Sequence, residues 1–309
     1  MSSTNPALKR RPRSRDLLHT HQENALNAVI YIVMTALMFI SIYPLYYSLV
    51  ASFSDAKSLL STYGPLWAPL KPYTLRGYTL SFMNVGIMIG FKNTVIYVVA
   101  GTSLGLVLTT LGAYCTSRKQ FMIRGAAMKM ILVTMFFSGG IIPLFFIVRG
   151  VGIYNTGWSF FLPYAISSYN LIIMRTFFMS IPETLEEAAR LDGANDLQIL
   201  FHVYIPLSTA VIAVITMYYG VGYWNSWYQA LMFMRTRDLY PLQMFLREVL
   251  ITNQSQNTAA DVTSMAGQSF DRELIKYCTV IISTVPILVI YPFLQRYFVK
   301  GVMMGAIKG

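Results

Sequence analysis

Five of the thirteen acidic residues of this chain lie in one short segment, residues 182–207, between two long apolar runs. These five are Glu183, Glu186, Glu187, Asp192 and Asp196. Carboxylates are costly inside a bilayer, so a cluster of them between apolar runs belongs to a surface that faces water. The insert therefore predicts a docking element for a partner that is not membrane.

The first half of this insert has the pattern of a helix. Pro182 suits the first turn, because its missing N–H would have no partner there. Glu186 and Arg190 have the i,i+4 spacing with the acid first, which is the better order for an ion pair on a helix. Glu187 has Leu191 at i+4, so it has no cationic partner within the helix.

The second half predicts a sharp corner and a second helix. Gly193 can adopt the left-handed conformation that ends a helix. Asn195 or Asp196 can cap the next helix. Apolar residues then recur at helical spacing, and Pro206 is expected to break the pattern.

No set of residues in the chain indicates catalysis. The three histidines, His19, His21 and His202, are scattered, so no nucleophile–His–acid set can be argued. Cys115 and Cys278 are the only cysteines, and neither a disulfide nor a CxxC metal site is expected. The chain also has no GxxxxGK[ST] phosphate loop. We therefore predict no catalytic residue, cofactor or metal, and an energy source on a separate subunit.

A second cluster, of aromatic and amide side chains, lies in the apolar run after the insert. Its leading members are Tyr218, Tyr223, Trp224 and Asn225. Aromatic faces stack on the C–H faces of sugar rings, and amides hydrogen-bond to hydroxyls. The alternative is an aromatic belt at the membrane interface, or simple packing. Both interpretations remain open for these residues.

The elements that must position these groups are membrane helices. Of the 309 residues, 55% are apolar and only 12% are charged, about half the charged fraction of a soluble domain. Six runs without charge are each long enough for a span of about 20 residues. The predicted spans are 27–52, 91–116, 128–148, 157–178, 207–233 and 277–297. This pattern predicts an all-α membrane protein with six transmembrane helices.

Basic residues indicate the orientation of the spans. The cluster from Lys9 to Arg15 and the short loop 117–129 carry the strongest bias, which places both on the cytoplasmic side. Both termini and the insert at 181–206 are then cytoplasmic. The basic N-terminus is interpreted as a topogenic tail, and no nucleic-acid partner is expected.

The chain divides into a basic N-terminal tail, 1–25, and one six-span membrane domain, 26–309. Within that domain we expect a long external loop at 234–276 and a cytoplasmic tail at 298–309. Every acidic residue lies outside the apolar runs. Proton- and sodium-coupled carriers usually need carboxylates at depth, so their absence argues against a self-powered carrier.

The insert also carries a family resemblance. Glu187, Ala188 and Ala189, then Asp192-Gly193, then Ile205-Pro206 resemble the "EAA…G…I-x-L-P" loop of permease subunits of bacterial ABC importers, although that family usually has Leu before Pro. The tail QRYFVKGVMMGAIKG, from Gln295, is similar to that of maltose-type carbohydrate permeases. The segment 137–178 is similar to the subfamily for complex, often uronic-acid-containing, oligosaccharides.

This resemblance implies a fold, partners and site roles. It implies a type I ABC importer permease fold in the bacterial cytoplasmic (inner) membrane, with six helices and a cytoplasmic two-helix coupling loop. A second permease, as a heterodimer, two ATP-binding subunits and an extracytoplasmic solute-binding protein are the implied partners, beside membrane lipid and the oligosaccharide. Glu187 would pair with an Arg of the ATPase, and the loop 234–276 would reach into the binding protein.

The sequence analysis thus predicts a permease subunit of an ATP-driven oligosaccharide importer. Two alternatives stay open at this stage. One is an importer of another small solute, such as an amino acid or phosphate, because the loop motif is widely shared. The other is a secondary carrier or a polytopic membrane enzyme.

Overall fold

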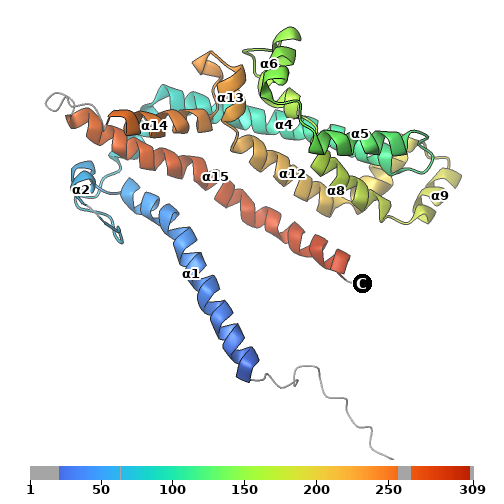
Figure 1. Cartoon of the computed structure of the whole chain (residues 1–309), viewed down its shortest axis with the longest axis horizontal. Helices are drawn as coiled ribbons and strands as arrows, with labels where there is room; N and C mark the ends of the chain where they lie inside the picture. The colour runs from blue at the N-terminus through green and yellow to red at the C-terminus, as the bar shows by residue number, and fades with distance from the viewer. Residues whose placement is uncertain (1–20, 63, 257–265, 307–309) are drawn as a thin grey trace, which may run out of the picture.

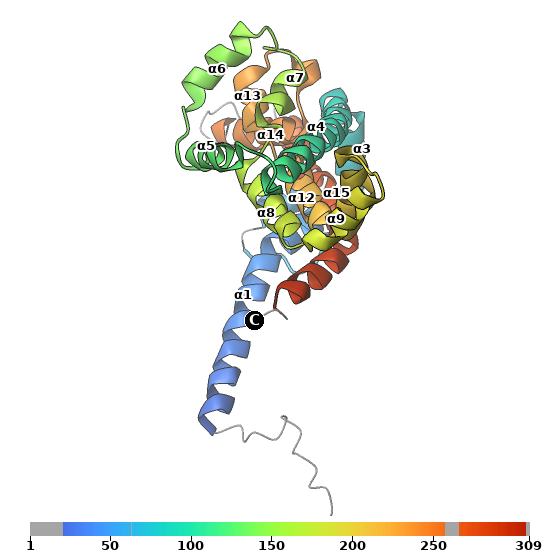
Figure 2. The same cartoon turned by 90° about the vertical axis from the view of Figure 1, so that its right-hand side faces the viewer.

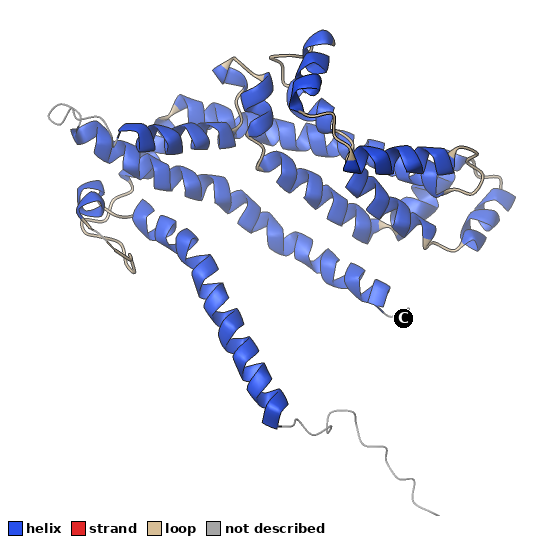
Figure 3. Cartoon of the chain, in the orientation of Figure 1, coloured by secondary structure: helices blue, strands red, loops and turns tan. Residues whose placement is uncertain are grey.

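The computed structural model describes residues 21–62, 64–256 and 266–306, and in these ranges it contains helices and loops but no strand (Figure 3). The helices that form the body are α1 (His21–Ser52), α4 (Val85–Ser117), α5 (Arg124–Phe136), α6 (Ile141–Gly150), α8 (Ser168–Met179), α12 (Thr209–Trp224) and α15 (Ala266–Ala306). Shorter helices connect them: α2 (Ala56–Ser61), α3 (Arg76–Met83), α7 (Trp158–Phe161), η1 (Leu162–Tyr164), α13 (Tyr228–Phe233), η3 (Arg237–Leu239) and α14 (Leu242–Gln256). The charged insert forms α9 (Glu183–Leu191), α10 (Asp196–Ile199), η2 (Leu200–Tyr204) and α11 (Ile205–Leu207).

Helix α4 lies at the centre of the bundle. It packs against α8, α12 and α14, while α15 packs against α1, α3, α12 and α14 (Figure 1). The largest apolar cluster forms where α4, α7, α8 and α12 meet, and it includes Tyr97, Phe160, Met174 and Ile215. This cluster includes residues of α4, α8, the charged insert and α12, and so holds these elements in fixed positions relative to one another.

Helix α1 stands apart from this bundle. In both views it leans away from the other helices over most of its length (Figures 1 and 2). Only its C-terminal part packs, for example through Tyr47 against Tyr277 of α15, with ring centroids 5.8 Å apart. The apolar side chains of its first half are exposed, among them Ile32, Phe39 and Ile40.

Three helices of the described residues are long and apolar enough to cross a bilayer, namely Leu26–Ser52, Val85–Ser117 and Asp271–Pro292. Two bent pairs raise the number to five if each pair is one span: Arg124–Phe136 with Ile141–Gly150, and Asp196–Leu207 with Thr209–Trp224. The chain therefore has the expected apolar helices, but the predicted spans 128–148, 157–178 and 207–233 are not continuous helices.

Each interruption has a local cause. Gly140 has φ of 83°, a left-handed conformation favoured by glycine, and α5 and α6 diverge there by 116°. Pro163 lies in the 3-10 turn η1, and Ser167 then starts α8 by accepting a hydrogen bond from the N–H of Asn170. At the end of α12, the Asn225 side chain donates to the carbonyl of Val221 at 3.0 Å.

The two ends of the bundle carry different elements. Helices α2 and α14 lie at one end and α9 lies at the other (Figure 1). The expected tail 298–309 is a continuation of α15 as far as Ala306. Most of the N-terminal tail, at 1–20, and part of the predicted loop 234–276, at 257–265, lie outside the described residues.

Candidate functional site

The charged insert folds as two helices with a corner, as its sequence predicts. Helix α9 begins directly after Pro182 and ends at Leu191. Gly193 has φ of 83°, and no atom lies within 4 Å of a Cβ added there. Asn195 caps α10 with a reciprocal pair of hydrogen bonds to Gln198, of 2.9 and 2.8 Å. The backbone conformation of Gly193 and the cap at Asn195 thus define the corner, and the space beside Gly193 is open.

The second half of the insert differs from the prediction. Pro206 does not end the helix, which continues through Leu207 and turns by 86° at Ser208 into α12. Pro206 has no N–H to close an α-helical turn, and the preceding residues widen into the π-helical turn η2, with the Ile205 N–H donating to the Leu200 carbonyl. The insert therefore leads directly into α12.

The residues of the predicted coupling loop lie mainly on its outer surface. The exposed members are Glu187, Ala188, Asp192, Gly193 and Pro206, whereas Ala189 and Ile205 are half-buried. Large apolar side chains share this surface: Leu191 is 90% exposed, Leu197 60% and Phe201 59%. An apolar and acidic surface of this kind suits a protein partner better than open water.

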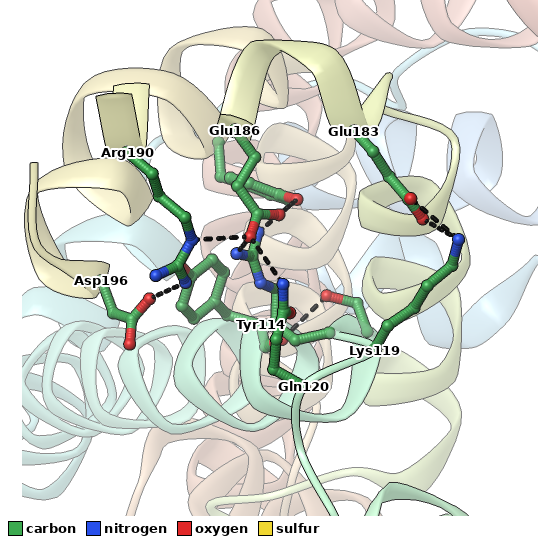
Figure 4. Close-up of polar contacts among 10 residues, drawn as sticks. Tyr114, Lys119, Gln120, Glu183, Glu186, Arg190 and Asp196 are labelled. Atoms are coloured by element: carbon green, nitrogen blue, oxygen red, sulfur yellow. Dashed lines mark hydrogen bonds and ion pairs between the residues drawn. The ribbon is translucent and has the colours of Figure 1, made fainter. Parts of the chain in front are cut away.

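The buried carboxylate of the insert is Glu186, next to the predicted Glu187. Glu186 forms an ion pair with Arg118, and both side chains are less than a tenth exposed (Figure 4). The Tyr204 hydroxyl donates to Glu186 Oε2 at 3.3 Å and accepts from Arg118 Nη1 at 2.8 Å. The Arg118 guanidinium also lies over the rings of Tyr114 and Tyr204, at 5.1 and 5.5 Å from their centroids.

Further polar contacts surround this buried pair (Figure 4). The predicted Arg190–Glu186 ion pair is confirmed, at 3.2 Å, and Arg190 also binds Asp196 at 2.5 Å. On the outside, Lys119 and Glu183 form an ion pair at 2.5 Å with both side chains more than half exposed. Segment 118–120, α9 and η2 therefore meet at one carboxylate.

Sequence reasoning gave Arg118 only as one of the basic residues of a topogenic loop and did not single out Glu186 or Tyr204 for a joint role. Adjacent glutamates on a helix point in directions about 100° apart, so only one of them can face the bundle. Nothing in the spacing says which one, because Arg118 lies far away along the chain. The available signal was that Arg118 directly follows a long apolar run, in a loop predicted to lie on the same side of the membrane as the insert.

A second candidate site is a groove between η1, α8, α12 and α13, with a volume of about 680 Å³. Its lining is aromatic and polar, and none of its lining residues is charged. It includes Tyr169, Asn170, Tyr218, Tyr219, Gly222, Tyr223, Ser226 and Gln229. Such a surface can stack on ring faces and hydrogen-bond to hydroxyls, which suits a sugar better than an ion.

Two of these tyrosines are held by buried hydrogen bonds. The Tyr219 hydroxyl lies 2.7 Å from Thr109 Oγ1 of α4 and accepts from the Ser167 N–H at 3.0 Å. The Tyr223 hydroxyl donates to the carbonyls of Phe161 and Tyr164, at 3.2 and 3.1 Å. Their rings form the fixed back of the groove, whereas Tyr218 is 38% exposed.

The four residues predicted for the substrate path do not all lie together. Tyr218 and Tyr223 line the groove. Trp224 points elsewhere: it is buried, its Nε1 donates to the Ser283 carbonyl at 2.9 Å, and its ring meets Phe91 edge-on. Asn225 caps α12 and does not line the groove. Tyr219 belongs to the aromatic cluster of the sequence but not to its leading members, and Asn170 was not singled out, because its place in the groove depends on how α8 packs against α12.

Among the described residues no group of three or more His, Cys, Asp or Glu side chains is arranged to hold a metal ion.

The chain matches known proteins over most of its length. Residues 108–303 match the family described as binding-protein-dependent transport system inner membrane component. The chain is 35% identical over 280 residues to the polygalacturonan/rhamnogalacturonan transport system permease protein YtcP of Bacillus subtilis (strain 168), covering 90% of this chain and 96% of the relative. It is 34% identical to protein LplC of the same organism, covering 87% and 90%.

The fold is similar to that of a solved structure, described as a bacterial ABC transporter involved in the import of the acidic polysaccharide alginate. The TM-score is 0.83 at 28% sequence identity, and the match covers 91% of this chain and 99% of the other.

Proposed function

Because the chain belongs to the family of binding-protein-dependent transport system inner membrane components, we propose that it is the permease subunit of an ATP-driven importer of oligosaccharides. The observation that carries the proposal is the outward-facing helical insert at one end of the bundle, joined through α12 to an uncharged tyrosine-lined groove. One element is suited to a soluble energy-supplying subunit, and the other to a sugar.

The insert is the proposed docking site for the ATP-binding subunits. Its exposed leucines and Phe201 supply apolar area, and the exposed Glu187 supplies a charge for a basic residue of the ATPase. In the described part of the chain, Glu187 has no ion pair of its own, which leaves it available to a partner. Ala188, Ala189 and Asp192 complete the loop pattern that resembles the family, and small residues allow close approach.

The proposed orientation places α9 and both termini on the cytoplasmic side. The basic cluster from Lys9 to Arg15 supports this side for the N-terminus. The position of α14 and α9 at opposite ends of the bundle supports an external location for α14 (Figure 1). Six crossings follow if the bent pair α5–α6, the interrupted segment 157–178 and the segment 207–233 each count as one.

The groove is the proposed substrate path. Tyr218 offers an exposed ring, and Asn170, Ser226 and Gln229 offer hydrogen-bonding groups beside it. Relatives named for polygalacturonan, rhamnogalacturonan and alginate support complex oligosaccharides, including uronic-acid-containing ones, as the substrate class. An uncharged lining binds such a chain weakly through ring faces and hydroxyls, so that it can also be released.

The exposed apolar surface of α1 supports a second permease subunit and lipid as neighbours. With one groove on each permease, the path would form between two such subunits, as a heterodimer. Two ATP-binding subunits and an extracytoplasmic binding protein complete the proposed importer.

The experiment that tests the function is reconstitution of the permease pair with its ATP-binding subunits and binding protein in vesicles. Uptake is measured for a panel of neutral and uronic oligosaccharides, with amino acids and phosphate as controls. We expect binding-protein-dependent uptake of at least one oligosaccharide that requires ATP. Uptake of amino acids or phosphate alone would contradict the substrate class, and uptake without ATP would contradict the energy source.

The docking site has its own test, Glu187→Ala. We expect the variant to insert normally, but to copurify less ATP-binding subunit and to lose uptake. Removing one partner of a charge pair that is buried at an interface costs about 2–5 kcal/mol of binding free energy. Copurification of the ATP-binding subunit is the measurement. Glu183→Ala, on the same helix and already paired with Lys119, is the matched control. Equal recovery of the two variants would exclude Glu187 from the contact.

A further inference from the structure

Helix α9 is held to the bundle by very little apolar packing. Glu186 is its one buried residue, and Ala189 is half-buried against the core. Its leucines point outward, with Leu185 44% and Leu191 90% exposed. The exposed Lys119–Glu183 pair adds little, because solvent-exposed ion pairs contribute only about 0–1 kcal/mol. The orientation of α9 therefore rests mainly on the Glu186 carboxylate.

That carboxylate joins three separate segments. Arg118 belongs to the turn that follows α4, Tyr204 to the π-helical turn before α12, and Glu186 to α9 itself. We call these three residues the Glu186 cluster. Charge-assisted hydrogen bonds between buried side chains are directional and strong, so the cluster fixes angles as well as distances.

Two routes lead from this cluster to the groove. Through Arg118 it reaches α4, whose Thr109 bonds to the Tyr219 hydroxyl behind the groove at 2.7 Å. Through Tyr204 it reaches α12, which begins at Thr209 after the turn at Ser208 and carries Tyr218. Packed helices and buried hydrogen bonds form both routes, and contiguous networks of this kind can carry coupling between two sites.

We propose that the Glu186 cluster is the joint that transmits movement of α9 to the two helices that build the groove. Glu186 is then a positioning residue for transport, distinct from Glu187, which faces outward. This inference rests on the proposed function, since it needs an ATPase that moves α9. It predicts that the cluster can be weakened without loss of docking, because the exposed docking residues Glu187, Ala188 and Leu191 do not belong to the cluster.

The test compares two carboxylates on one helix in the reconstituted complex. Glu186→Gln removes the buried charge and keeps the shape, and Glu183→Gln removes the exposed charge beside it. The readout is the ratio of ATP hydrolysis with and without binding protein and oligosaccharide, together with copurification of the ATP-binding subunit. We expect the ratio to fall roughly 2- to 30-fold for Glu186→Gln, the range of coupling energies along such networks, and to stay unchanged for Glu183→Gln.

A crosslink separates transmission from simple folding. Lys119→Cys and Glu183→Cys replace the exposed pair, in a background with the exposed Cys115 changed to Ala. A bis-maleimide then ties α9 to segment 118–120 without the carboxylate. We expect this tie to restore the stimulated ratio in Glu186→Gln, which a fault in folding or in ATPase contact would not allow.

Different results would overturn the role of the Glu186 cluster and the proposed function. Where Glu186→Gln is not recovered from the membrane, Tyr204→Phe takes its place, since it keeps the ion pair and removes only the hydroxyl between its partners. The inference is overturned if Glu186→Gln keeps the wild-type ratio of stimulated to basal ATP hydrolysis, or if the crosslink does not restore a lowered ratio. The proposed importer function is unaffected by either result. A wild-type chain that neither binds an ATP-binding subunit nor supports uptake overturns the proposed function, and the inference with it.

Discussion

Tyr218 and Trp224 belong to one helix and face different surroundings. Tyr218 is partly exposed in the groove, whereas Trp224 is buried and hydrogen-bonded to the Ser283 carbonyl. The two aromatic residues therefore have different roles in α12. The ring of Tyr218 is the one that we propose for the substrate path, and the ring of Trp224 holds α12 to α15.

Alanine substitutions should separate these roles. We expect Tyr218→Ala to lower uptake roughly two- to tenfold at unchanged expression, the range given by the loss of one ring-stacking contact. Trp224→Ala should instead destabilise the fold by about 3–5 kcal/mol, because it empties a buried site. Uptake, membrane yield and thermal stability are measured for both variants. Reduced yield of Tyr218→Ala, or normal stability of Trp224→Ala, would contradict this assignment.

Position 193 requires a left-handed backbone conformation, but it has room for a side chain. Its φ of 83° disfavours β-branched residues, yet a Cβ at this position would meet no atom within 4 Å. We expect Gly193→Val to cost about 1–3 kcal/mol at the corner and to impair assembly with the ATPase. Gly193→Asn, which tolerates the left-handed region, is the control. Equal complex recovery for both variants would show that assembly does not need this backbone conformation.

At the level of elements, glycines of α4 let neighbouring helices approach closely. A Cβ on Gly105 would lie 2.9 Å from the Ala165 carbonyl oxygen, a backbone atom that cannot move aside cheaply, and 3.1 Å from the Tyr219 ring. The ring of Tyr219 can sit behind the groove because this position has no side chain.

Gly105→Ala should therefore destabilise the helix packing by about 1–3 kcal/mol, as other overpacked cores do. Gly220→Ala on α12 is the matched control, since the nearest atom to its added Cβ is Thr102 Oγ1 at 3.9 Å. We expect this control to retain full stability, because Ala favours a helix over Gly. Thermal unfolding of the purified complex measures both, and similar values for the two variants would contradict the close approach at Gly105.

The helices, corners and caps could be predicted from the sequence where they depend on residues that are adjacent in the chain. The absence of charge at 130–148 indicates apolar helix, but it does not reveal the bend at Gly140, since hydrophobicity carries no information about φ. The corner at Gly193 and the cap at Asn195 were predictable because both depend on adjacent residues. The burial of Glu186 rather than Glu187 depends on Arg118, and the grouping of Tyr219 with Asn170 depends on helix packing, so neither could follow from spacing.

At the scale of the whole molecule, the two ends of the bundle are proposed to serve different partners. The polar stretch before α15 is the expected contact for the binding protein. Its first residues, Asn253–Gln256, form the last turn of α14 rather than a loop, and the rest, 257–263, lies outside the described residues.

Deleting residues 257–263 should spare both neighbouring helices and impair delivery of substrate. We expect normal insertion and normal recovery of the ATP-binding subunit, because α9 lies at the other end of the bundle (Figure 1). Binding-protein-stimulated uptake should fall strongly. A variant with the same seven positions changed to Gly and Ser controls for length alone. Full uptake by the deletion would show the segment to be a passive connector.

The scant anchoring of α9 also has a consequence for the lifetime of the subunit in a cell. An element that buries a single side chain opens locally at a lower free energy than the bundle does, and such openings are where proteases cut. If α9 docks on an ATP-binding subunit as proposed, the helix is covered in the assembled importer and uncovered in an unassembled subunit. Proteolysis at α9 would then remove unassembled copies first and keep the amounts of the subunits in balance.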